Sequence, residues 1–98
     1  MNTANLQLEG LYAAVAAMMT ALRDKGLLNA DEIDAALASA EGTLSNDPGR
    51  PTELSHSHMD AICFPLRYLR LANESCAKGE DLTFTQLATK VGRMKPDN

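Results

Sequence analysis

A polar segment in the middle of the chain, SHSHMDAIC, contains the residue types that bind transition metals. His56, His58, Asp60 and Cys63 carry imidazole, carboxylate and thiol groups, which are the ligands that zinc and related ions prefer. Their spacing does not suit one helical face, because Ile62 and not Cys63 lies four residues after His58. The sequence has no second ligand pair such as Cys-x-x-Cys or His-x-x-x-His. We therefore expect no metal and no cofactor, and a metal-binding alternative would use His56 and His58.

Catalysis by a cysteine nucleophile is the second chemistry that this segment suggests. A reactive thiol needs a neighbouring base and a partly exposed, electropositive setting. Cys63 would meet His56 or His58 only if the chain before its helix folded back, and Cys76 lies near Lys78. The sequence contains no glycine-rich phosphate loop, no paired-carboxylate signature and no nucleophile elbow. We therefore expect that the protein is not an enzyme and has no catalytic residues.

The two cysteines also bear on the cellular compartment. Cys63 and Cys76 fall on one predicted helical segment, which would hold them roughly 20 Å apart, whereas a disulfide needs Cα atoms about 5–6 Å apart. Free thiols with apolar neighbours are typical of a reducing compartment. The apolar run LYAAVAAMMTAL has no Lys or Arg before it and is shorter than the ~20 residues that span a bilayer. We therefore expect a cytoplasmic protein with no membrane association.

The elements that position these residues are predicted to be helices. The sequence has 98 residues, no tryptophan and only 4% aromatic residues, so its core must be built from Leu, Ala, Met and Ile. Ala, Leu and Met are strong helix formers, and the length is close to that of a common single domain. We therefore predict an all-α fold: a single helical domain over residues 1–98, built as a small bundle of four main helices.

The first predicted helix runs from about Thr3 to Lys25 and is apolar around much of its circumference. Large side chains recur at spacings of three and four, and alanines occupy a second face. The large side chains are Leu8, Leu11, Tyr12, Val15, Met18, Met19 and Leu22. Gly26 ends this helix, and Asn29 with Glu32 gives the next helix a capping box. Residues 1–41 are thus predicted to form a helical hairpin.

The second half of the chain is predicted to follow a long connection. Residues 42–57 contain two prolines and two glycines and are predicted to form a loop. Residues 58–92 show two further helical patterns, the first of which ends at Gly79. Pro65 lies inside that pattern, so we predict that the third helix is kinked or split there. Residues 93–98 are predicted to be a frayed tail.

The last predicted helix begins after Thr83, which forms a capping box with Gln86, and ends at Gly92. Its sequence, TFTQLATKVG, resembles the second helix of the helix-turn-helix family, which implies DNA binding. The matching residues are Thr83, Gln86, Leu87, Ala88, Val91 and Gly92. In that family a recognition helix follows the turn, whereas only residues 93–98, with Pro96 among them, follow here. A nucleic-acid-associated regulator is therefore the alternative interpretation. It would use Arg67, Arg70, Lys90, Arg93 and Lys95.

Charge and apolar surface together favour a role in protein association. The formal net charge of −4 argues against a nucleic-acid partner, because phosphate contacts need a basic surface. The first helix carries more apolar surface than a small bundle is expected to cover, and such surface indicates a partner. We predict a homodimer, with binding of a regulatory protein partner as the other form of association. The predicted interface residues are Leu11, Val15, Met18, Met19 and Leu22.

Overall fold

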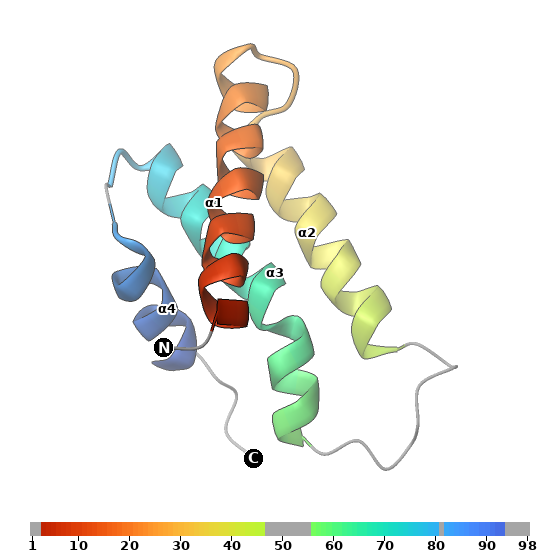
Figure 1. The fold of residues 1–98 in the computed structure, drawn as a ribbon. Helices are drawn as coiled ribbons and strands as arrows, with labels where there is room; N and C mark the ends of the chain where they lie inside the picture. Colours follow the sequence, from red (N-terminus) through yellow and green to blue (C-terminus); the bar gives the residue numbers. More distant parts are fainter. Residues whose placement is uncertain (1–2, 47–55, 81, 94–98) are drawn as a thin grey trace.

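Four α-helices make up most of the residues that the computed structural model describes, which are 3–46, 56–80 and 82–93. They are α1 (Thr3–Asp24), α2 (Ala30–Ser45), α3 (His56–Ala77) and α4 (Phe84–Arg93). These described ranges contain no strand, which confirms the predicted all-α class. Figure 1 shows α2 lying alongside α3, with α4 on the other side of α3.

The turn between α1 and α2 forms as its sequence predicts. Gly26 adopts a φ of 71°, which a glycine reaches without a Cβ clash, and the Leu27 N–H donates to the Leu22 carbonyl at 3.1 Å. The Asn29 side chain accepts from the Glu32 N–H at 2.8 Å, while the Glu32 carboxylate accepts from the Asn29 N–H at 2.9 Å. This reciprocal pair is the predicted capping box, and it starts α2 directly after the turn.

The predicted loop over residues 42–57 is wrong at both of its ends. Helix α2 continues to Ser45, where Asn46 caps it by donating its backbone N–H to the Gly42 carbonyl, and α3 already begins at His56. The Thr43 and Ser45 hydroxyls donate to carbonyl groups one turn earlier, so these polar residues are accommodated within the helix. Residues 47–55 lie outside the described part of the chain.

Helix α3 is continuous through Pro65, so the predicted split does not occur, and the kink stays a prediction. Packing of the residues on both sides of the proline holds the helix together, because Cys63, Tyr68 and Leu69 are all buried. The helix ends as expected at Gly79, which has a φ of 77°.

Helix α4 begins as predicted but ends later. The Gln86 N–H donates to the Thr83 hydroxyl at 3.2 Å, and the Thr83 N–H donates to the Gln86 side chain at 2.8 Å. Gly92 does not end the helix, which runs through Arg93, and its φ is not positive. Burial of Val91 anchors the last turn, and the basic Arg93 side chain suits a helix C-terminus. Residues 94–98 of the predicted tail lie outside the described residues.

The core is centred on α3, which contacts each of the other three helices. Its buried members are Met19, Ile33, Tyr68, Leu69, Leu87 and Val91. Three aromatic rings join α1, α3 and α4: the ring centroids of Tyr12 and Tyr68 lie 4.8 Å apart, and that of Phe84 lies 5.7 Å from Tyr12 and 5.2 Å from Tyr68. Stacked and tilted rings at such distances contribute beyond simple burial, so this cluster attaches α1 to the rest of the fold.

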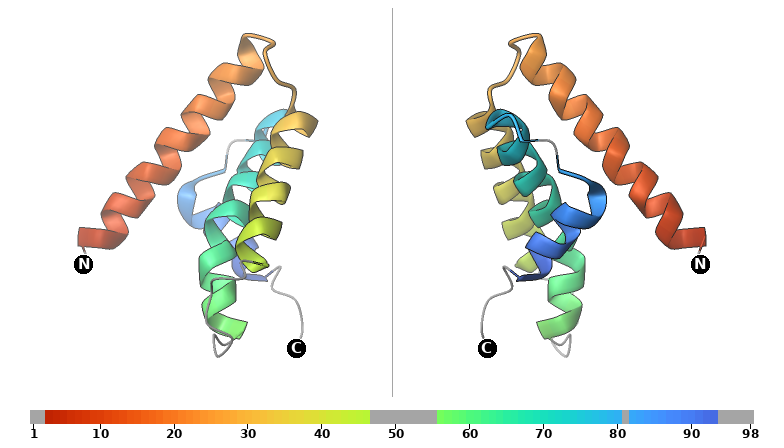
Figure 2. Two further views of the ribbon diagram at one scale, coloured as in Figure 1. Left: turned by 90° about the vertical axis from the view of Figure 1, so that its right-hand side faces the viewer. Right: turned by 90° about the vertical axis from the view of Figure 1, so that its left-hand side faces the viewer.

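Helix α1 diverges from the other helices toward its N-terminal end. Figure 2 shows α1 closest to α2 and α3 near the turn that joins it to α2 and farthest from them at its start. All nine residues from Thr3 to Leu11 are exposed, whereas Tyr12 and Met19 pack into the core. Only the C-terminal part of α1 is therefore covered by its own chain.

Candidate interaction surface

The largest exposed apolar side chains of the described residues lie on α1 and the turn that follows it. Leu11 is 58% exposed and Met18 is 68% exposed, although both side chains are large and apolar. The others in this set are Leu6, Leu8 and Leu27. From Gly10 to Ala21 the other exposed residues of α1 are all small, namely Gly10, Ala13, Ala14, Ala17 and Ala21. Large apolar side chains gathered on one element indicate a binding surface more strongly than scattered ones do.

This surface is almost uncharged. Glu9 is the single charged side chain of α1 before Arg23. At 100° per residue, Glu9 lies on the side of the helix away from Leu11 and Met18. The flank that runs from Leu8 through Leu11 and Met18 to Ala17 therefore carries no charge. Such a flank makes its contacts by apolar packing and can be desolvated at little cost.

The five predicted interface residues divide into three groups. Leu11 and Met18 are exposed and available to a partner. Val15 and Leu22 are half-buried and pack against the core of their own chain. Met19 is 6% exposed and belongs to that core. The spacing of these five residues predicts only that they share the apolar part of one helix. How the other helices pack against α1 decides which of the five are buried.

The core-facing stripe of α1 continues beyond the part that its own chain covers. Leu8 lies one turn before Tyr12 and on the same face, yet it is 47% exposed. One turn further along, Tyr12 lines a hollow of about 460 Å³ between α1, α3 and α4, with Phe64 and Val91 among its other walls. The divergence of α1 thus leaves both an apolar side chain and an apolar cavity without a partner within the described chain.

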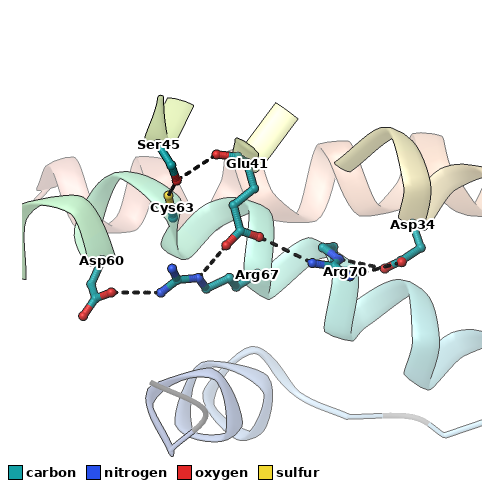
Figure 3. Close-up of polar contacts among 7 residues, drawn as sticks. All are labelled: Asp34, Glu41, Ser45, Asp60, Cys63, Arg67 and Arg70. Atoms are coloured by element: carbon teal, nitrogen blue, oxygen red, sulfur yellow. Dashed lines mark hydrogen bonds and ion pairs between the residues drawn. The ribbon is translucent and has the colours of Figure 1, made fainter. Parts of the chain in front are cut away.

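A network of ion pairs between α2 and α3 fixes the two helices against each other (Figure 3), and two of its members, Asp60 and Arg67, also line the hollow. The Arg67 guanidinium donates to the Glu41 carboxylate at 2.8 Å and to the Asp60 carboxylate at 3.1 Å. The two carboxylates raise the pKa of Arg67, mainly through the Glu41 hydrogen bond. Nearby, the Ser45 hydroxyl lies 3.3 Å from the Cys63 sulfur and donates to the Glu41 carbonyl at 3.0 Å.

Arg70 extends this network along α2. Its guanidinium donates twice to Asp34, from Nε to Oδ1 at 2.8 Å and from Nη2 to Oδ2 at 3.2 Å. The hydrogen bond from Arg70 lowers the pKa of the Asp34 carboxyl below its ordinary value. Glu41 Oε1 is buried without a hydrogen bond and lies 3.5 Å from Arg70 Nη1, an ion-pair contact. The network therefore links both arginines through Glu41.

The basic residues that DNA binding would need are not gathered on one free surface. Arg67 and Arg70 are paired with carboxylates of α2 and of α3 itself. Lys90 and Arg93 are exposed on α4, and Lys95 lies outside the described residues. The network thus compensates two of the five charges within the molecule.

Asn73 is a structural residue that the sequence analysis missed. It is 2% exposed, its side-chain oxygen accepts from Arg23 of α1, and its side-chain nitrogen donates to the Ala30 carbonyl at 2.9 Å. One side chain of α3 therefore ties the end of α1 to the start of α2. A polar residue flanked by apolar ones in a helical pattern is the available signal, but its partners are remote in sequence.

Of the candidate metal and thiol residues, the structure describes the side chains of His58, Asp60, Cys63 and Cys76. His58 is exposed, and the side chain of His56 lies outside what the structure describes. Cys63 is buried and Cys76 is exposed, and both are free thiols. No group of three His, Cys, Asp or Glu side chains in the described ranges is placed to hold a metal ion. Among those same ranges, no helix is both long enough and apolar enough to cross a membrane.

Comparison with protein-family models, curated proteins and solved structures finds no match to this chain. The functional interpretation therefore depends on the surface of α1 and on the charges around it.

Proposed function

We propose that this is a non-enzymatic protein that works by protein–protein association, and that its first partner is a second copy of itself. The observation that carries the proposal is the exposure of Leu11 and Met18 on the uncharged flank of α1. Burying a leucine or methionine side chain contributes about 1.5–3 kcal/mol, so a few such residues supply much of a dimer's affinity. The two free thiols support a reducing compartment such as the cytoplasm.

Charge supports a second copy over a strongly charged partner. Each chain has a formal net charge of −4, so two copies approach only through a surface that adds no further repulsion. The flank of α1 around Leu11 and Met18 meets that condition. It offers no ion-pairing groups to a basic or an acidic partner. Closed two-fold dimers are also the commonest arrangement of identical chains.

Sedimentation velocity on purified protein tests the proposal, using the wild type beside Leu11→Glu and Ala36→Glu. We expect the wild type to be a dimer at about 100 µM, a concentration at which a complex with a micromolar dissociation constant is mostly formed. Leu11→Glu places a charge in the contact and should give a monomer. Ala36 is exposed on α2, so its variant is the control and should remain dimeric. A wild type that stays monomeric throughout contradicts the proposal.

A further inference from the structure

The hollow between α1, α3 and α4 is the feature that self-association alone does not explain. It measures about 460 Å³, within the range of about 300–1,000 Å³ for cavities that take whole ligands. Tyr12, Phe64 and Val91 give it apolar walls. Open apolar walls lose the dispersion contacts and the burial that a filled core provides. This cavity therefore has a physical reason to accept an apolar group.

On the basis of the proposed self-association, we infer that the N-terminal part of α1 from a second copy fills this hollow, and that the two copies do so reciprocally. The segment that enters is Thr3–Leu11, with Leu6 and Leu8 as its large apolar side chains together with Leu11. All nine of its residues are exposed in the single chain. Figure 2 shows this end of α1 standing away from the other helices.

The area that a stable dimer needs favours this interlocked arrangement over a contact between two α1 flanks alone. Helix α1 has 22 residues and is therefore roughly 33 Å long and about 10 Å across. Half of the accessible surface of such a helix is then about 650 Å², which falls short of the ~800 Å² that each partner buries in a typical stable complex even if one whole side is covered. In the interlocked dimer each chain contributes twice, once with Thr3–Leu11 and once with the walls of its hollow.

The charges around the hollow are compatible with an apolar guest from an acidic chain. Its two charged lining residues, Asp60 and Arg67, form an ion pair of 3.1 Å. Arg67 is bound further by Glu41 at 2.8 Å, so it has no unused charge that would select an anionic ligand. Between Thr3 and Leu11 the entering helix carries only Glu9. The contact therefore adds one charge, Glu9, to a wall whose charged groups are already paired, and the segment and the hollow together form a self-complementary surface, as a two-fold dimer requires.

A pair of glutamate substitutions at Leu8 and Met18, which lie about 80° apart around α1, tests the inference. Leu8→Glu alters the side of α1 that faces the hollow, and Met18→Glu alters its outer side. Leu8 is 47% exposed and Met18 is 68% exposed in the single chain, so neither substitution should disturb folding. We expect Leu8→Glu to raise the dissociation constant at least about tenfold, since each dimer loses two buried leucine side chains. Met18→Glu alters the part of the flank that lies outside the hollow and should raise it clearly less than Leu8→Glu does. Helical circular dichroism at low concentration checks the fold of both.

The outcomes separate this inference from the proposed function. Dissociation by Met18→Glu with no effect of Leu8→Glu, an equal effect of both, or an effect of neither overturns the interlocked arrangement. Self-association itself survives these results provided that Leu11→Glu dissociates the dimer. A wild type that is monomeric at about 100 µM overturns both proposals, because the occupant is then not a second copy.

A chemical cross-link gives a second, independent readout. Cys76 is exposed and is first changed to serine in every variant, while the native Cys63 is buried. A Leu8→Cys chain is mixed with an Ala61→Cys chain of different mass, because Ala61 lines the hollow. We expect a short thiol-specific reagent to join the two chains. Replacing the first chain by a Met18→Cys chain should abolish the product. A cross-link that forms with Met18→Cys and not with Leu8→Cys overturns the inference.

Discussion

Asn73 connects three helices through one buried side chain. Its oxygen accepts from Arg23 of α1, and its nitrogen donates to the Ala30 carbonyl at the start of α2. The Asn73→Ala variant leaves both of these groups without their partner in a poorly solvated site. We expect the free energy of unfolding to fall by about 1–3 kcal/mol, as measured by urea denaturation. Glu74→Ala, at the exposed neighbouring position, is the control and should change it by less than about 0.5 kcal/mol.

The Asp34–Arg70 pair makes part of the stability depend on pH. Arg70 lowers the pKa of Asp34 in the folded state below its ordinary value of 3.8, so the unfolded chain binds this proton more readily. The stabilisation is therefore complete above about pH 4 and is lost as the pH falls through the folded pKa. The two side chains are 43% and 38% exposed, so solvent screening limits the effect to less than about 1 kcal/mol.

Urea denaturation across the acidic range tests this dependence. We expect Asp34→Asn to be less stable than the wild type at pH 7 and to approach it below about pH 3. Asp24→Asn, at the exposed end of α1, is the matched control and should not show this convergence. If the difference in the free energy of unfolding between Asp34→Asn and the wild type is the same at every pH, the Asp34–Arg70 ion pair does not cause the pH dependence.

At the scale of the elements, two glycines near helix ends have opposite roles. Gly42 lies inside α2 without a positive φ, whereas Gly79 follows α3 with a φ of 77°. A Cβ added at either position meets no atom within 4 Å, so backbone conformation alone separates them. We expect Gly42→Ala to raise the free energy of unfolding by about 0.5–1 kcal/mol and Gly79→Ala to lower it by about 1–2 kcal/mol. Thermal unfolding of the two variants side by side measures both changes. If both variants are stabilised, or both are destabilised, the two glycines do not have opposite roles.

Helix α1 combines two roles along its length. Its C-terminal part carries Tyr12 and Met19 into the core, and the ring of Tyr12 stacks on Tyr68 at 4.8 Å. Its N-terminal part, from Thr3 to Leu11, is exposed although it carries three leucines. The first part fixes the direction of the helix, and the second part presents leucines to a partner. The direction of α1 relative to α3 and α4 thus decides how many of its apolar side chains stay exposed.

At the scale of the whole molecule, the balance of charge predicts how association responds to salt. Two copies of a chain with a net charge of −4 repel each other, and the proposed contact contains almost no ion pairs. Added salt screens the repulsion and also favours apolar burial. We therefore expect the dimer dissociation constant, measured by sedimentation at about 0.05 M and 0.5 M sodium chloride, to fall about two- to fivefold. A rise with salt would indicate that opposite charges hold the contact.

Linkage to stability gives a second measurement at this scale. Because dimer formation stabilises the folded state, the melting temperature of the wild type should rise with protein concentration. Leu11→Glu removes the contact and should give a melting temperature that does not depend on concentration. The Ala36→Glu control should behave as the wild type does.

Local signals in the sequence determined the all-α class and most helix boundaries. Gly26 and Gly79 end helices, and the Asn29–Glu32 and Thr83–Gln86 pairs start them, because each of these effects acts within a few residues. The same reasoning ended α2 too early and ended α4 at Gly92. In both places helical packing and hydrogen bonds outweighed the preference of glycine for a break.

Only the tertiary structure decided which apolar residues of α1 are covered. Met19 and Leu8 share one stripe in the sequence, but α3 and its neighbours cover the first and leave the second exposed. Likewise, the sequence suggests that Arg67 and Arg70 are available to bind DNA. In the fold they form ion pairs with Glu41 and Asp34. The physical reason is the same in both cases. Periodicity fixes the face of a helix on which a side chain lies, whereas burial and ion pairing depend on contacts between residues that are distant along the chain.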